Sequence, residues 1–169
     1  MVLTLDRETI ERVERYTYLG SMINANWDQS EEVRCRIEKA RTIFNKKKTF
    51  FVSKNLSLKL KIRMVRCYIL PVLLYGVEAW TMTEALMRRL ESFEMWIYRR
   101  ILRISWIKHT TNEEVLRRVD KTKEVTFTVQ MRKMKYSGHV MRNNKYRLLQ
   151  LILQGKVDGG RGPGRRRNS

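Results

Sequence analysis

The first 23 residues alternate between short apolar runs and charged or polar residues. The runs are "VLTL", "TIERV" and "YTYLGSMI". Alternation with a period of two is typical of β-strands, and charged clusters between such runs indicate turns. The pattern predicts a β-hairpin followed by a third strand over "YTYLGSMI", which Gly20 interrupts.

From residue 28 the apolar positions follow a helical period. A first helix is predicted over residues 30–48, with a capping box of Asp28 and Glu31 and with Ser30 as a competing N-cap. Its apolar stripe consists of Val33, Ile37, Ala40 and Phe44. A second helix is predicted over residues 57–70. Pro71 should kink or break it, because proline lacks an N–H and clashes with the preceding turn.

Further helices are predicted after residue 80. Thr81 and Glu84 form a capping box for a third helix, and Thr111 with Glu114 marks the start of a short fourth helix. The third helix has a long apolar face, made by Leu86, Leu90, Phe93, Ile97, Ile101 and Ile104. A fifth helix is expected over residues 123–142, although "VTFTVQM" within it alternates like a strand, and a sixth over "KYRLLQLIL".

The last segment, "GKVDGGRGPGRRRNS", has the composition of a flexible basic arm rather than of a core. The expected fold class is therefore mainly α. A small N-terminal β-hairpin or three-strand element precedes a helical, thumb-like bundle and the arm. The expected divisions are 1–27 (strands), 28–107 (first helical region), 108–154 (second helical region) and 155–169 (tail).

The charge of the chain indicates its class of partner. Lys and Arg total 36 against 17 acidic residues, which gives a net charge of +19 and a pI near 10.4. Hydrophobic residues make up 43%, so a real core is expected. Such a surface binds nucleic-acid phosphates or anionic lipid, and we favour nucleic acid.

Basic side chains gather around the junction of the first two helices, where Glu38 is the only acid between residues 33 and 77. Lys59, Arg63 and Arg66 have the spacing i, i+4, i+7 and share one helix face. A solvated helix face is the alternative, and a nuclear import signal is the alternative for the arginines of the tail. The candidate nucleic-acid-binding residues are Arg41, Lys46, Lys47, Lys48, Lys59, Arg63, Arg66, Arg165, Arg166 and Arg167.

Several classes of chemistry find no support in the residues. The acidic residues are scattered, mostly in first helical turns, where they favour the helix dipole, so no catalytic or metal-binding carboxylate cluster is predicted. Cys35, Cys67, His109 and His139 do not have metal-ligand spacing, and the cysteines are expected to be reduced. The aromatic residues with helical spacing are expected in the core or at its rim rather than stacked on bases. They are Trp80, Trp96, Tyr98, Trp106 and Tyr136.

No membrane segment or secretory signal is expected. The most apolar run, "CYILPVLLYGVEAW", is shorter than the roughly 20 residues that span a bilayer. It is predicted to be a buried core helix, and the protein is expected to be intracellular.

An ordered set of motifs resembles the C-terminal part of the endonuclease–reverse transcriptases encoded by non-LTR (LINE-type) retrotransposons. The motifs are "ERYTYLGSMI", "EEVRCRIEKARTIF", "ILPVLLYGVEAWTMT", "RRLESFEMWIYRRILRISW", "TTNEEVL", "SGHVMR" and the Gly/Arg-rich tail. The resemblance implies that Tyr18, Leu19 and Gly20 lie at a palm–thumb junction as a primer-grip-like motif. It also implies that the helices after them form a thumb. The family's catalytic Asp pair, fingers and endonuclease would lie upstream, so this chain would correspond to a fragment.

The resemblance implies a non-catalytic part of an RNA-directed DNA polymerase that grips the backbone of a template–primer duplex of RNA or DNA without base specificity. No cofactor is expected in this chain, whereas the full-length family enzyme would use Mg²⁺. A nuclear location is expected, and a missing palm would leave apolar surface around Met22 and Ile23 for self-association. The alternatives are a helical protein-interaction module and a non-functional truncated retroelement product.

Overall fold

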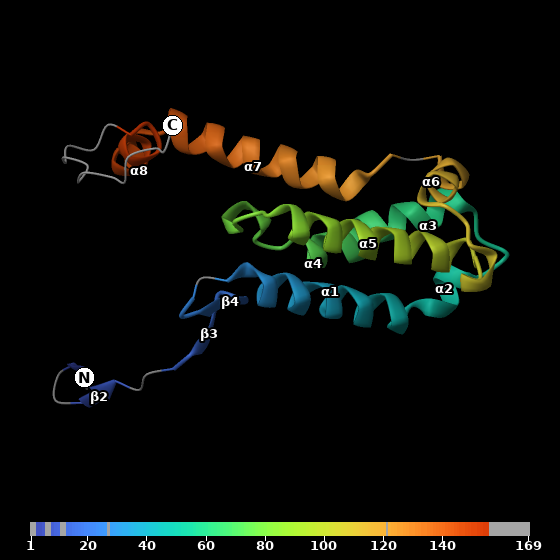
Figure 1. Ribbon diagram of the computed structural model, residues 1–169, viewed down its shortest axis with the longest axis horizontal. Coiled ribbons are helices and arrows are strands. Elements are labelled where there is room, and N and C mark those ends of the chain that lie inside the picture. Colours follow the sequence, from blue (N-terminus) through green and yellow to red (C-terminus); the bar gives the residue numbers. More distant parts are fainter. Residues whose placement is uncertain (1–2, 6–7, 11–12, 27, 121, 156–169) are drawn as a thin grey trace, which may run out of the picture.

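The computed structural model describes residues 3–5, 8–10, 13–26, 28–120 and 122–155. The fold is mainly α, as expected, with short strands at the N-terminus. The long helices α1 (Gln29–Lys46), α5 (Glu84–Ile101) and α7 (Glu124–Arg142) lie one above another in Figure 1, and α5 packs against both of the others. The predicted arm from residue 156 onward lies outside the described residues.

The N-terminal strands form two separate hairpins. Strand β1 (Leu3–Leu5) pairs antiparallel with β2 (Glu8–Ile10), and β3 (Arg15–Tyr18) pairs with β4 (Ser21–Asn24). The expected third strand is thus itself a hairpin. Leu19 and Gly20 adopt φ values of 46° and 82°, the left-handed pair of a tight two-residue turn. The alternating pattern did not indicate this turn, because leucine rarely adopts such a φ and is therefore not a turn signal.

Helix α1 begins at the predicted cap. The Asp28 carboxylate accepts a hydrogen bond of 2.9 Å from the Ser30 N–H. The helix ends at Lys46, and the short α2 (Lys48–Val52) follows it directly. Val33, Ala40 and Phe44 are buried as the stripe predicts, and the Phe44 ring stacks on Phe51 of α2 at 4.6 Å.

The break expected at Pro71 is replaced by a local change of helix type. Helix α3 (Leu58–Met64) passes into the π-helical segment η1 (Val65–Ile69) and then into α4 (Leu70–Leu73). The Leu70 N–H bonds to the Val65 carbonyl, five residues back. Such a wider turn contains one extra residue. It gives room to the Pro71 ring, which would clash with the preceding turn of an α-helix. After Gly76 the chain forms the 3₁₀ turn η2 (Val77–Ala79), so the apolar run is not the one buried helix that the sequence predicts. Its Leu73, Leu74 and Val77 are buried, whereas Cys67, Tyr68 and Tyr75 are exposed.

The third predicted cap was wrong by two residues. Helix α5 is capped by Thr83, whose Oγ1 accepts from the Leu86 N–H at 3.3 Å, and not by Thr81. Trp80 is buried with an extended backbone, so the chain continues past Thr81 before it becomes helical. Leu86, Leu90, Phe93, Ile97 and Ile101 of the predicted apolar face are buried. Ile104 was wrongly included, because it lies beyond the end of α5 and is half-buried.

The remaining helices lie close to their predicted positions. After the turn η3 (Trp106–Lys108), α6 (Asn112–Val119) is capped by Thr111, as predicted. The strand-like "VTFTVQM" is helical within α7, also as predicted. The turn η4 (Asn144–Tyr146) then leads into α8 (Arg147–Leu153). Trp80 and Tyr98 are core residues and Trp96 is half-buried, whereas Tyr136 is exposed.

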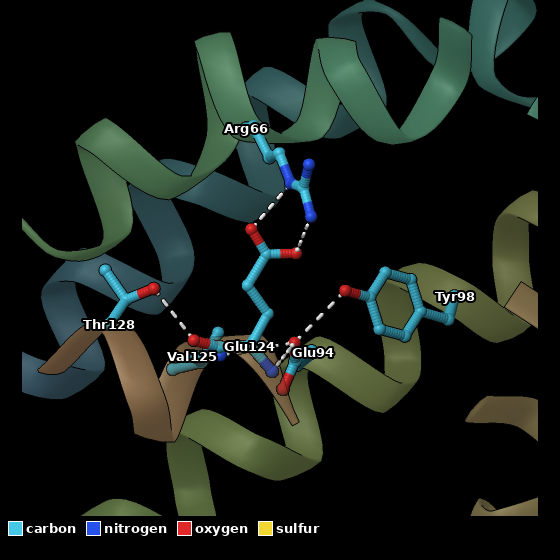
Figure 2. Close-up of polar contacts among 6 residues, drawn as sticks. All are labelled: Arg66, Glu94, Tyr98, Glu124, Val125 and Thr128. Carbon is cyan, nitrogen blue, oxygen red and sulfur yellow. Dashed lines mark hydrogen bonds and ion pairs between the residues drawn. The ribbon is translucent and has the colours of Figure 1, made fainter. Parts of the chain in front are cut away.

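The start of α7 is held by a carboxylate from α5. Lys123 occupies the N-cap position of α7 without a side-chain hydrogen bond. Glu94 Oε1 takes over this role and accepts from the backbone N–H groups of Glu124 (3.0 Å) and Val125 (3.3 Å), and also from the Tyr98 hydroxyl (3.1 Å) (Figure 2). Two orphan donors of the helix terminus are thereby satisfied by a partner from another helix.

A second contact at the same place ties α7 to η1. The Arg66 guanidinium donates to both carboxylate oxygens of Glu124, at 2.6 and 3.0 Å (Figure 2). Bidentate pairs of this kind have fixed geometry as well as charge attraction. The three segments α5, α7 and η1 are therefore joined at one point by two carboxylates.

The burial of Glu94 predicts a pH-dependent stability. Only 2% of Glu94 is exposed, and this burial raises the pKa of its carboxyl from 4.5 to about 7. The native state therefore holds a proton that the unfolded chain releases. The stabilisation is complete below about pH 4.5 and is lost as the pH rises to about 7, with a total on the order of 3 kcal/mol.

We expect Glu94→Gln to remove this dependence, because the amide keeps a carbonyl acceptor for the α7 N–H groups but does not titrate. Urea unfolding at a series of pH values from 4.5 to 7 should show the unfolding free energy of the wild type falling relative to that of the variant. Glu84→Gln, at an exposed position of the same helix, is the control. Parallel curves for the wild type and Glu94→Gln would contradict the assignment.

Candidate nucleic-acid interface

The YLG motif forms the tip of the β3–β4 hairpin. Tyr18 and Leu19 are 57% and 75% exposed, so their side chains project from the tip. The carbonyls of the turn are both occupied: that of Leu19 accepts from the Tyr75 hydroxyl at 2.9 Å, and that of Gly20 accepts from Arg36 Nη2 at 2.5 Å. The motif is thus held by its backbone and presents its side chains.

A buried ion pair on α1 anchors this hairpin. Glu32 and Arg36 are both buried and lie one turn apart, with Oε1 and Nε at 2.7 Å. The other oxygen of Glu32 accepts from the Met22 N–H at 2.8 Å, and the Arg36 guanidinium lies 4.5 Å from the centre of the Tyr75 ring. Each charge thus has partners beyond the other charge, which a buried pair requires if it is to offset its desolvation.

Gly20 of the YLG motif is required for its backbone conformation rather than for a close approach of another segment. A Cβ at this position would lie 3.7 Å from the Tyr75 ring, an ordinary contact. Its φ of 82° is the stronger reason for glycine, since other residues rarely adopt that conformation.

Five of the predicted basic residues lie on the surface near the helix junction. Lys46, Lys47 and Lys48 are exposed where α1 gives way to α2, and Lys59 and Arg63 are exposed on α3. The structure therefore leaves all five accessible to an anionic partner.

Two other predicted residues are engaged within the protein. Arg66 is paired with Glu124, and these hydrogen bonds raise the pKa of Arg66. Arg41 pairs with Glu38 at 2.8 Å and lies over the Trp96 ring at 5.4 Å. Their charges are largely balanced where they stand, so they contribute less to a free cationic surface than the sequence indicates. Arg165, Arg166 and Arg167 lie outside the described residues.

A cationic groove that the sequence did not single out lies between α2 and the C-terminal end of α5. It encloses about 790 Å³. We call it the α2–α5 groove. Its cationic side chains are Lys48, Arg99, Arg100 and Arg103. Its other lining residues are Val52, Ser92, Met95, Trp96, Ile104, Ser105 and Asn112. Of these cations, only Lys48 was among the candidates.

The groove arises where two stretches without acidic residues meet. No Asp or Glu lies between Glu38 and Glu78, and none lies between Glu94 and Glu113. Among the described residues no carboxylate oxygen comes within 4.0 Å of a cationic nitrogen of the four groove side chains. The local potential is consequently positive. Burial, together with the charge of Arg103, lowers the pKa of Lys61, whose Nζ donates to the Ser53 carbonyl.

Other chemistry is not apparent in the described part of the chain. Its residues contain no group of three His, Cys, Asp or Glu side chains that could hold a metal ion. Over the same residues, none of the helices is both long enough and apolar enough for a membrane span. His109 and His139 are both exposed.

We expect Arg36→Ala to destabilise the protein by about 3 kcal/mol, because it leaves the Glu32 carboxylate buried without its charge partner. Urea unfolding measures this loss. Arg34→Ala, at an exposed position of the same helix, should change the unfolding free energy by less than about 0.5 kcal/mol. Equal effects of the two substitutions would show that the pair does not anchor the hairpin.

Comparison with known proteins gives one informative likeness. The chain is 28% identical over 148 residues to a Caenorhabditis elegans protein described as uncharacterized and transposon-derived. The match covers 86% of this chain and 53% of that protein, so the chain spans about half the length of the relative it matches. No family model matches the chain, and no solved structure matches it. The likeness indicates that this chain, with its helical fold and cationic groove, is related to proteins of transposon origin.

Proposed function

We propose that this chain is the nucleic-acid-binding, thumb-like part of a LINE-type retrotransposon reverse transcriptase. It grips the backbone of a template–primer duplex without reading its bases, and it has no catalytic step of its own. The ordered motifs that end in the Gly/Arg-rich tail and the similarity to a transposon-derived protein support this assignment.

The observation that carries the proposal is the collection of unbalanced cations at one end of the helical body. Lys46, Lys47 and Lys48 at the α1–α2 junction adjoin the α2–α5 groove, which Lys48 also lines. Lys and Arg side chains that neutralise phosphates release condensed counterions. This supplies affinity without sequence preference. In the proposed interface the exposed lysines and the arginines of α5 contact phosphates, and the YLG tip contacts the primer side.

Exposed apolar side chains favour a second candidate, a helical module that docks on another protein. Helix α8 has no buried residue, and its Leu148 and Leu153 are 70% and 61% exposed. At the other end of the chain Tyr16, Tyr18 and Ile23 are exposed on the β3–β4 hairpin, near the surface expected to mediate self-association. Size-exclusion chromatography with light scattering separates the candidates, since a monodisperse monomer would remove the motive for docking.

The proposed binding is testable by its salt dependence. We expect the affinity for a blunt RNA–DNA or DNA duplex, measured by fluorescence anisotropy, to fall steeply as salt rises. Lys46→Gln/Lys47→Gln/Lys48→Gln should reduce the slope of log K against log salt by about 2 to 3, or about 0.9 for each lost phosphate contact.

The matched control removes three cations that already have carboxylate partners. Arg88 pairs with Glu84, and Arg117 and Arg118 both pair with Glu114. Arg88→Gln/Arg117→Gln/Arg118→Gln should leave the slope nearly unchanged. Affinity that does not respond to salt, or equal loss in both triple variants, would refute the proposed interface.

A further inference from the structure

We propose that the α2–α5 groove takes one unpaired nucleotide of a single-stranded extension, with the base over an apolar floor and its phosphate among the arginines of α5. This inference rests on the proposed function and deepens it, since duplex gripping alone needs no such pocket. It assigns a ligand class to the apolar lining of the groove, which the backbone-gripping role leaves without a task.

The shape of the groove favours a nucleotide over a duplex backbone. A duplex offers its phosphates on a convex surface, which flat or gently curved helix faces can follow. The groove instead is a partly open hollow of about 790 Å³, a volume within the range of small-molecule pockets. A nucleotide that leaves the stack can enter such a space, whereas a paired one cannot.

The lining has the two parts that a nucleotide needs. Met95 is buried at the floor, with Trp96 and Ile104 beside it, and these apolar atoms suit the faces of a base. Arg99, Arg100 and Arg103 surround this floor with charge, and Asn112 adds an amide. A free inorganic anion would be satisfied by the charges alone and would gain nothing from the floor.

Two of the side chains are fixed in advance. Trp96 stacks on Phe93 with ring centres 5.4 Å apart, and the Arg100 guanidinium lies 5.1 Å from the centre of the Trp96 indole. Bases stack on aromatic rings and also on the planes of arginine guanidinium groups. The Arg100 guanidinium, placed over Trp96, therefore offers a plane on which a base can stack at the groove.

Arg99 adds a directed donor. Its Nη2 donates to the Thr110 carbonyl at 2.8 Å and to Asn112 Oδ1 at 3.0 Å, so the guanidinium is held in place. Its Nη1 is buried and has no hydrogen-bond partner among the described residues. A buried donor without an acceptor is costly, and a phosphate oxygen that reaches Arg99 would supply the missing acceptor.

Fluorescence anisotropy with the full chain tests the proposal on three probes. They are a blunt duplex, the same duplex with a short single-stranded extension, and that extension with abasic sites in place of its bases. We expect the extended duplex to bind about tenfold more tightly than the blunt one, which is the worth of stacking about one base. The abasic extension should lose most of this gain.

In the variant Arg100→Gln/Arg103→Gln the extended and blunt duplexes should bind with equal affinity. Arg88→Gln/Arg89→Gln removes the same charge from exposed positions of α5 outside the groove and should preserve the ratio. A shift of indole fluorescence on binding the extension, absent in Trp96→Phe, gives a readout at the floor itself. Thermal melting of each variant confirms that it is folded.

The outcomes separate the two proposals. Equal, salt-dependent binding of blunt and extended duplex would overturn the nucleotide pocket and leave the backbone grip standing. Equal binding of the normal and abasic extensions, or an unchanged ratio in Arg100→Gln/Arg103→Gln, would also overturn the pocket. Failure to bind any of the three probes would refute the proposed function together with the pocket.

Discussion

Helix α5 is the element on which the rest of the structure depends. Helices α1, α2, α6 and α7 all pack against it, so its residues lie at the centre of the core that the described residues form. Leu90 and Ile97 are almost fully buried, and each such side chain stabilises the folded state by about 1.5–3 kcal/mol relative to exposure. The apolar face ends at Ile101, Arg99 and Arg100 of the α2–α5 groove lie in the same last turn, and Arg103 follows directly after the helix. The core and the cationic surface are therefore built from one helix, and the groove is only as rigid as the packing beneath it.

Because the chain is strongly positive, the positions of its few acidic residues matter for its stability and for its surface charge. A net charge of +19 opposes compaction through self-repulsion. The structure places carboxylates where they join segments: Glu32 holds the β3–β4 hairpin, Glu94 caps α7, and Glu124 ties α7 to η1. Acids that serve as internal joints are not available to neutralise the surface. The end of the molecule around α2 consequently keeps a field that attracts phosphates.

Local signals in the sequence predicted local structure well. Asp28 and Thr111 cap their helices as expected, because a cap depends on a few adjacent residues. The sequence placed the cap of α5 at Thr81, whereas Thr83 caps the helix after the buried, extended Trp80. Burial is a tertiary effect that the spacing of a capping box does not record. The turn at Leu19 and the π-helical turn before Pro71 also depend on contacts or strain that a periodic pattern does not record.

The candidate site was predictable only in part, for a similar reason. The exposed lysines between α1 and α3 follow from their spacing, but the pairing of Arg66 with Glu124 joins residues far apart in the chain. The α2–α5 groove likewise unites Lys48 with arginines of α5 that sequence spacing does not connect. The absence of acids on both stretches was visible in the sequence. Only the packing of α2 on α5 shows that the two stretches meet.

The arrangement also limits how one nucleic acid could engage both ends of the molecule. The β3–β4 hairpin lies at the start of α1, and α2 lies at the other end (Figure 1). The groove is therefore at that end too, since Lys48 and Val52 of α2 line it. Helix α1 has 18 residues and is therefore about 27 Å long. A duplex that touches the YLG tip and the groove must follow α1 for about eight base pairs, at 3.4 Å for each pair. The exposed groups are aromatic and aliphatic at the hairpin and cationic at the groove. In the proposed complex, phosphate attraction would therefore act mainly at the groove, and the hairpin would contribute apolar contacts that salt does not weaken.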